Sequence, residues 1–247
     1  MVTVRELGNS PTAQGLVAGG LVLLSAALQA LASLERWVTG VRDWTRTDHL
    51  IEDHRFDYLY PADPWEPIGA AAEVSGLGLI LLGVGVGLLA HAATAGRPRT
   101  APWVAPLAAI PFVLLGVHAV ASGLIGAPSF LAWLVEWGFL PLMIVSVGGL
   151  VWLVLLALRR TPLWSLAALL LIGVTPLGYL VSAFGIAPYV AGYQSYDTTP
   201  WTETILAAWT ATAGLFITLG AAVHRDYATR LSGPGGRDHS GMSGPRT

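Results

Sequence analysis

The sequence predicts an all-α integral membrane protein with six transmembrane helices. Hydrophobic residues make up 54% of the 247-residue chain and charged residues only 11%, against about 25% charged in soluble domains. The mean hydropathy is +0.62. Long apolar blocks, most near the roughly 20 residues that a helical membrane crossing requires, alternate with polar connections. We place the spans at about 15–34, 69–93, 103–125, 130–158, 163–186 and 202–223.

Composition narrows the possible chemistry. A net charge of −2 without any basic stripe argues against nucleic-acid binding. The chain has no Cys, which excludes disulfides and thiolate metal sites, and all 13 basic residues are Arg, which excludes a Lys Schiff base. We expect no cofactor, apart from the divalent metal considered below. The expected partners are the lipid bilayer and another membrane or envelope protein.

The first apolar block, 15–34, follows a polar segment at 1–14 that we assign to the cytoplasm. A signal peptide is the alternative, because Ala30 and Ala32 form an A-x-A cleavage pattern before Ser33. The block is longer than a usual signal core, and the residues before it are barely basic. A retained first span is therefore the favoured interpretation.

The distribution of Arg predicts the topology. Alternate connections carry Arg97, Arg99, Arg159, Arg160, Arg225 and Arg230, whereas the connections at 126–129 and 187–200 carry none. Because cytoplasmic loops are enriched in basic residues, both termini are predicted to be cytoplasmic in the cell membrane. The Gly-, Ser- and Pro-rich tail at 225–247 is predicted to be a disordered cytoplasmic segment.

A weak internal repeat indicates three tandem helical hairpins. Trp65, Trp133 and Trp201 are each 68 residues apart, and each lies before or at the start of a descending span. Each Trp is followed by an acidic residue: Glu73, Glu136 and Glu203 respectively. The alternative is that Trp simply favours membrane interfaces.

Two outer loops, 35–68 and 187–201, are predicted to form an outer cap. The stretch DHLIEDHRFDYLYPADPWEP at 48–67 contains six acidic residues. Aromatic residues beside acids are suited to binding a cationic or sugar-like headgroup or a partner protein, although an interfacial aromatic belt is the alternative. The candidate cap residues are Asp57, Tyr58, Tyr60, Asp63, Trp65, Tyr193, Tyr196, Asp197 and Trp201.

Ionisable residues within the spans are a second candidate site, because charge is costly in hydrocarbon and is retained chiefly for function. Glu73, His118 and Glu136 fall about 10 Å below the outer helix ends, and Glu203 lies nearer the surface. If these side chains face one another, they could bind a cation or relay protons. Otherwise each Glu is stabilised at a helix N-terminus, and His118 hydrogen-bonds a neighbour.

A metal site is the third candidate. In a helical conformation, His49, Asp53, His54 and Asp57 would be spaced three or four residues apart, as metal ligands often are. An exposed acidic segment that pairs with Arg is the alternative. No GxSxG, HExxH or P-loop pattern is present, so no catalytic residue is assigned.

Proline and glycine residues within the spans are predicted to affect how the helices bend and pack. Pro106, Pro111, Pro141 and Pro176 are predicted either to kink their helices and widen a cavity below the cap or to serve packing. The GVGVG stretch at 83–87 lies inside an apolar block and is interpreted as a helix-packing surface.

The favoured function is a binding or structural component of a membrane assembly, acting through the acidic, aromatic outer cap, and enzyme activity is the less favoured interpretation. The first alternative is a small transporter or ion pathway through the Glu and His cluster. The second is a membrane-embedded, metal-dependent enzyme.

Overall fold

The computed structural model describes residues 10–39, 54–95, 101–194 and 199–231, and this part of the chain is helical with no strand. Five of its helices are long and apolar enough to cross a membrane: Pro11–Thr39, Ala71–Thr94, Trp103–Ile125, Phe139–Ala157 and Thr202–Val223. A sixth crossing is present among the described residues if Pro162–Ile172 and Pro176–Ala191, which are bent by 68°, form one span.

Four helices correspond closely to predicted apolar blocks. Helix α2 (Pro11–Leu34) begins with Pro at the first helical position, where the missing N–H has no cost, and continues as a π-helical turn, η1 (Glu35–Thr39). Helices α4 (Ala71–Thr94) and α5 (Ala101–Ile125) follow. Helix α11 (Thr202–Leu231) extends past the predicted end of the last span.

The predicted span at 130–158 is interrupted. It consists of a one-turn helix, α6 (Trp133–Glu136), and a longer helix, α7 (Phe139–Ala157). The predicted span at 163–186 is divided more strongly, into α8 (Pro162–Ile172), α9 (Pro176–Val181), the π-helical η3 (Ser182–Ile186) and α10 (Ala187–Ala191).

The break between α8 and α9 has a local cause. Pro176 has no N–H with which to continue the ladder to the carbonyl of Ile172. The hydroxyl of Thr175 donates to that carbonyl instead, at 2.7 Å, and also accepts the backbone N–H of Gly178 at 3.3 Å. Thr175 therefore ends one helix and caps the next.

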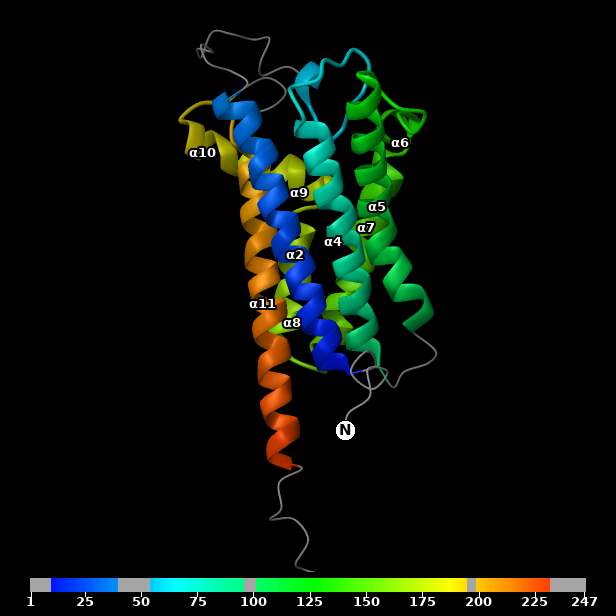
Figure 1. Cartoon of the computed structure of the whole chain (residues 1–247), viewed down its shortest axis with the longest axis vertical. Helices are drawn as coiled ribbons and strands as arrows, with labels where there is room; N and C mark the ends of the chain where they lie inside the picture. The colour runs from blue at the N-terminus through cyan, green and yellow to red at the C-terminus, as the bar shows by residue number, and fades with distance from the viewer. Residues whose placement is uncertain (1–9, 40–53, 96–100, 195–198, 232–247) are drawn as a thin grey trace, which may run out of the picture.

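The contacts between helices close a ring in chain order. Contacts join α2 to α4, α4 to α5, α5 to α7, α7 to α8 and α8 to α11, and α11 returns to α2. The direction of the helices alternates, so that the start of α2 and the end of α11 lie at one end of the bundle (Figure 1). We call the opposite end, which carries residues 54–70 before α4, the cap end.

Small residues allow close contact between neighbouring helices. A Cβ atom on Gly76 of α4 would lie 2.6 Å from the carbonyl oxygen of Gly116 in α5. On another face of α4, a Cβ atom on Gly85 would lie 3.1 Å from the carbonyl oxygen of Ala18 in α2. These contacts agree with the packing interpretation of the Gly-rich stretch in this helix.

At the end opposite the cap, two long side chains hydrogen-bond to backbone carbonyls of neighbouring helices. Arg160, in the turn after α7, donates to the carbonyls of Ala93 and Ala95 at the end of α4, which have no partner within the helix. Trp164 of α8 is buried, and its indole donates to the carbonyl of Ile217 in α11 at 3.0 Å.

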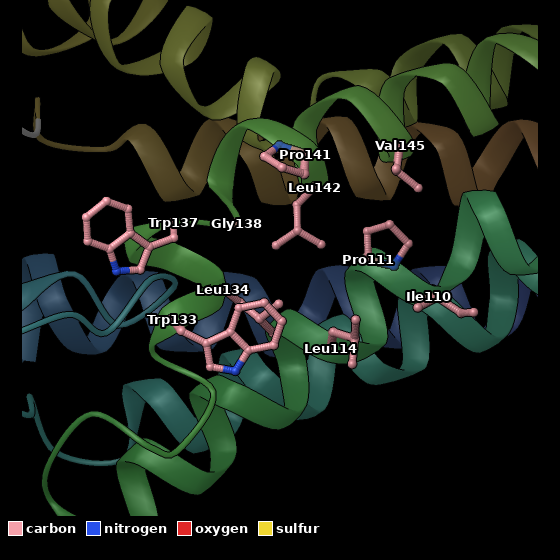
Figure 2. Close-up of a pocket in the computed structure, with 10 residues that line it drawn as sticks. All are labelled: Ile110, Pro111, Leu114, Trp133, Leu134, Trp137, Gly138, Pro141, Leu142 and Val145. Atoms are coloured by element: carbon pink, nitrogen blue, oxygen red, sulfur yellow. The ribbon is translucent and has the colours of Figure 1, made fainter.

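Of the four prolines considered above, only Pro176 coincides with a break. Helix α5 continues through Pro106 and Pro111, and Pro141 lies in the first turn of α7, where proline is tolerated. Pro111 and Pro141 do line an apolar groove between α5 and α7 (Figure 2).

Candidate functional site

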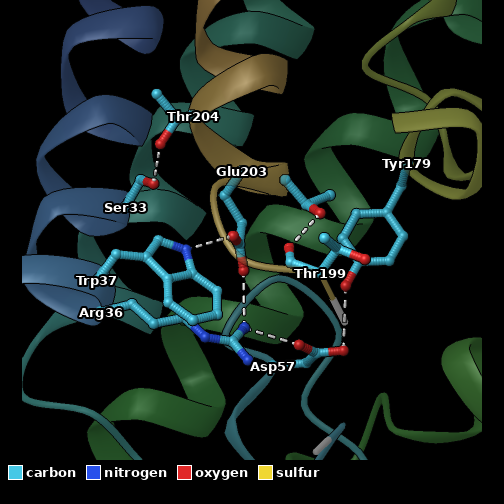
Figure 3. Close-up of polar contacts among 9 residues, drawn as sticks. Ser33, Arg36, Trp37, Asp57, Tyr179, Thr199, Glu203 and Thr204 are labelled. Atoms are coloured by element: carbon cyan, nitrogen blue, oxygen red, sulfur yellow. Dashed lines mark hydrogen bonds and ion pairs between the residues drawn. The ribbon is translucent and has the colours of Figure 1, made fainter. Parts of the chain in front are cut away.

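The most concentrated polar contacts in the described part of the chain surround Arg36, in η1 at the cap end (Figure 3). Arg36 is fully buried, yet its Nη1 donates to Oδ1 of Asp57 and to Oε1 of Glu203, each at 2.7 Å. The side chains of Asp57 and Glu203 are 12% and 3% exposed. A buried charge is tolerated when it is paired and hydrogen-bonded in this way.

The second oxygen of each carboxylate also accepts a hydrogen bond. The Trp37 indole donates to Oε2 of Glu203 at 2.8 Å, and the Tyr179 hydroxyl donates to Oδ2 of Asp57 at 3.2 Å. The Arg36 guanidinium carbon lies 4.5 Å from the centre of the Trp37 ring, a cation–π distance. We call Arg36, Trp37, Asp57, Tyr179 and Glu203 the Arg36 network.

The Arg36 network joins four parts of the chain. Arg36 and Trp37 lie on η1, which extends α2, and Tyr179 lies on α9, beyond the break at Thr175. Glu203 lies in the first turn of α11, where the helix dipole favours a carboxylate. Asp57 follows a short 3₁₀ helix, η2 (His54–Phe56), in the cap.

Residues 54–70, which lead from the first outer loop into α4, form what we call the cap segment. Three of its aromatic side chains, Tyr58, Tyr60 and Trp65, are buried. The Tyr60 ring makes edge-on contacts with Phe139 of α7 and Tyr179, at centroid distances of 5.6 and 5.1 Å. These aromatic side chains therefore attach the cap segment to the bundle instead of presenting an open aromatic surface.

Burial changes the acidity of two cap tyrosines. Loss of water raises the pKa of Tyr58 well above its ordinary value, and the negative charge of Glu203 raises it further. Burial likewise raises the pKa of Tyr60, with a smaller contribution from Asp57. Both hydroxyls are therefore protonated at neutral pH.

His118 of α5 is buried and joins the cap segment to the connection between α5 and α6. Its Nε2 lies 2.8 Å from the carbonyl oxygen of Pro61, and its Nδ1 lies 2.8 Å from the hydroxyl of Ser129. Because the carbonyl can only accept, Nε2 carries the donated proton, and Nδ1 can accept from Ser129. Both ring nitrogens are then satisfied, as in the structural alternative proposed from the sequence.

The other members of the predicted Glu and His cluster lie in different surroundings. Glu203 belongs to the Arg36 network, whereas Glu73 is half-buried against Gly123 of α5. Glu136 is exposed on α6. The contacts of Glu203 and His118 thus lead to different partners, and no hydrogen bond found in the described chain joins any two of the four residues.

The remaining candidate cap residues are exposed, half-buried or outside the described residues. Asp63 is exposed on the cap segment, and Tyr193 is half-buried after α10. Trp201 is half-buried, has φ of 72°, and lies 6.4 Å from the Trp37 ring. Tyr196 and Asp197 lie outside the described residues.

Two of the candidate metal ligands, His49 and Asp53, also lie outside the described residues. The backbone of His54 is in η2, and Asp57 is bound to Arg36 and Tyr179. Within the described ranges, no group of three or more His, Asp or Glu side chains could hold a metal ion.

Sequence reasoning identified Asp57 and Glu203 but missed Arg36, Trp37 and Tyr179. One signal was present: the pair Glu35 and Arg36 lies directly after an apolar run long enough to span a membrane. An Arg at that position needs a nearby carboxylate or water. Comparison with known protein families, curated proteins and solved structures finds no significant match for this chain.

Proposed function

We propose that the chain is a binding component of a membrane assembly, which presents a rigid acidic cap to a partner protein of the same membrane or envelope. The observation that carries this proposal is the internal attachment of the cap segment. Asp57 is bound by Arg36 and Tyr179, and the carbonyl of Pro61 is bound by His118, so three parts of the bundle hold one loop. A surface fixed in advance loses little conformational entropy on binding.

The outward face of the cap segment supplies the recognition chemistry. Asp63 is exposed, and the Glu66 side chain is 61% exposed. Glu66 pairs with Arg55 at 3.5 Å, and its backbone N–H donates to the Arg55 carbonyl at 2.8 Å, which holds the loop closed. An acidic surface of this kind favours a basic partner surface.

The test is co-purification in mild detergent from the native membrane. We expect the wild-type chain to retain a stable partner, and the double variant Asp63→Arg, Glu66→Arg to lose it. Arg159→Glu is the matched control, because it reverses an exposed charge at the end opposite the cap. A wild-type chain that retains no partner, or a double variant that keeps it, would contradict the proposal.

The proposed topology has six spans with both termini in the cytoplasm of the cell. The alternating helix directions support it, provided that the bent pair α8 and α9–α10 is one crossing. Arg159 and Arg160 lie at the end opposite the cap, which the positive-inside rule assigns to the cytoplasm. The three pairs α2–α4, α5–α7 and α8–α11 would then be the tandem hairpins.

A transport role is the second candidate, and the broken helix favours it. Helix α8 has 11 residues, or about 16 Å, so the break lies near the middle of a bilayer core about 30 Å thick. Broken helices at that depth form the ion and substrate sites of many transporters. Here the half-helix beyond the break carries Tyr179 to Asp57.

Flux measurements distinguish this second candidate from the first. If the protein conducts protons or alkali cations in proteoliposomes, Glu203→Gln should abolish that flux, whereas Glu136→Gln on the exposed helix α6 should not. Wild-type vesicles with no flux above protein-free vesicles would eliminate the transport role.

A further inference from the structure

An apolar groove lies between α5 and α7 at the cap end (Figure 2), with a cavity volume of about 390 Å³. This is within the roughly 300–1,000 Å³ of small-molecule sites. No charged side chain lines it, and the only side-chain polar atoms are the two indole nitrogens. Its lining consists of Ile110, Pro111, Leu114, Trp133, Leu134, Trp137, Gly138, Pro141, Leu142 and Val145.

The position of Gly149 on α7 explains why the groove exists. Leu142 and Val145 lie on one face of α7, and Gly149 is the next position on that face, four residues further from the cap. A Cβ atom on Gly149 would lie 2.7 Å from the backbone nitrogen of Ala108, so α5 and α7 touch there. The groove occupies the space between the two helices on the cap side of this contact.

The groove opens on the outer surface of the bundle. Ile110 and Val145 are 49% and 39% exposed, and Trp137 is 83% exposed. Because α5 and α7 are both candidate spans, the medium outside them is hydrocarbon. Water is a poor occupant, since a bound water needs two to four polar partners. An empty groove would forfeit dispersion contacts along its length. A lipid chain supplies those contacts.

The cap end of the groove has the features of a headgroup site. Trp133 of α6 and Trp137, which directly follows α6, border the groove. Glu136, the residue before Trp137, does not line the groove but is exposed next to it in the chain. The stretch from 126 to 141 contains no Arg, Lys or His that would attract an additional negative charge. Indole faces and a carboxylate together attract an ammonium group.

We propose that this groove binds one acyl chain of a bilayer phospholipid whose headgroup carries an ammonium group, held beside Glu136 and the two Trp rings. The site is separate from the Arg36 network and from the exposed acids of the cap segment. The proposal requires only that α5 and α7 cross the membrane, so it does not depend on a partner protein.

The first experiment tests the chain-binding groove by native mass spectrometry of the detergent-purified protein. We expect wild type to retain a phospholipid and Val145→Trp to lose it, because the larger ring fills the groove. Ile144→Trp is the matched control, since Ile144 is 61% exposed on the same helix but does not line the groove. Leu114→Phe fills the groove from the opposite wall if Val145→Trp does not fold. Retention by both filling variants, or absence of lipid from wild type, would overturn the proposal.

The second experiment tests the headgroup. In nanodiscs containing equal amounts of phosphatidylethanolamine and phosphatidylglycerol, wild type should retain the ethanolamine lipid about two- to fivefold more often, as an exposed cation–π contact supplies. Glu136→Gln should reduce this preference while retaining the bound chain. Equal retention of the two lipids by wild type, or a preference for phosphatidylglycerol, would refute the ammonium site.

Discussion

At the scale of single residues, Arg36 unites the cap end of the bundle, because one guanidinium nitrogen serves two carboxylates from distant parts of the chain. Replacing Arg36 with Met would leave Asp57 and Glu203 facing each other without their cation. Breaking a buried ion pair in this way costs about 3–5 kcal/mol. We therefore expect Arg36→Met to lower the free energy of unfolding by that amount, measured by denaturant titration in detergent micelles.

Arg55→Met is the control for this prediction. Arg55 pairs with Glu66, but the two side chains are 35% and 61% exposed, so the pair contributes at most about 1 kcal/mol. Equal destabilisation by the two substitutions would show that the buried ion pairs of Arg36 contribute no more to the free energy of unfolding than the exposed pair of Arg55.

The buried tyrosines predict sensitivity to alkaline pH. Burial raises the pKa values of Tyr58 and Tyr60 in the folded chain, while the unfolded chain releases these protons near pH 10. The resulting stability is complete below about pH 10 and is lost as the pH rises toward the folded pKa values.

We expect the unfolding temperature to fall above pH 10 in wild type, and to fall less in the double variant Tyr58→Phe, Tyr60→Phe. Thermal unfolding measured between pH 8 and 11, about one unit or more on either side of the free tyrosine pKa, provides the test. Tyr189→Phe is the control, since Tyr189 is 88% exposed. Identical pH profiles for wild type and the double variant would contradict the burial argument.

The residues of the Arg36 network were only partly predictable. Asp57 and Glu203 are identifiable because acids are scarce near apolar blocks, but their common partner Arg36 lies 21 and 167 residues away in the chain. No local pattern encodes that pairing. It arises only when the ring of helices brings the start of α11 beside the end of α2.

At the scale of helices, hydrophobic length predicted where most helices run, because the membrane requirement is a property of contiguous residues. The break before Pro176 is different. The apolar run continues across it, and the change in direction depends on one proline and on the two hydrogen bonds of the Thr175 hydroxyl. The proline marked the position, but its sequence context did not predict a bend of 68°.

The predicted hairpin repeat relates residues whose surroundings differ. Trp65 is 7% exposed and Trp133 is 55% exposed, while Trp201 is half-buried beside Trp37. Equal spacing therefore does not give these three side chains equal roles. If the repeat is real, the three hairpins share the order and direction of their helices but differ in the contacts of their side chains.

Close contact between α4 and α5 gives a prediction about packing. A Cβ atom on Gly76 would meet the carbonyl oxygen of Gly116 at 2.6 Å and the backbone nitrogen of Val120 at 2.7 Å. Backbone atoms cannot rotate away, so Gly76→Ala must separate the helices, at a cost of about 1–3 kcal/mol. Gly20→Ala on α2 is the control, since a Cβ atom there meets nothing within 4 Å.

Thermal unfolding in the same detergent should show a clear decrease for Gly76→Ala and almost no change for Gly20→Ala. If Gly76→Ala unfolds at the wild-type temperature, α4 and α5 can adjust their separation freely, and the proposed role of glycine in fixing it is incorrect.

At the scale of the whole molecule, the closed ring explains why the last helix, α11, is needed to complete the Arg36 network at the end of the first helix, α2. Contacts between α2 and α11 close the ring, and the hydroxyls of Ser33 and Thr204 are hydrogen-bonded across this junction at 2.7 Å. The Arg36 network lies directly beyond this bond, so its geometry depends on the last helix returning beside the first.

The proposed topology is testable with single introduced cysteines, because the chain contains no cysteine of its own. Asp63, Ala127 and Gln194 are exposed at the cap end. Cysteines there should react in intact cells with a membrane-impermeant thiol reagent. Cysteines at Ser10 and Arg159, at the opposite end, should react only after the cells are opened. Gln194 is decisive, because it follows the bent pair of helices: if the bent pair α8 and α9–α10 is a re-entrant loop and not a span, this position becomes inaccessible from outside while Asp63 and Ala127 remain labelled.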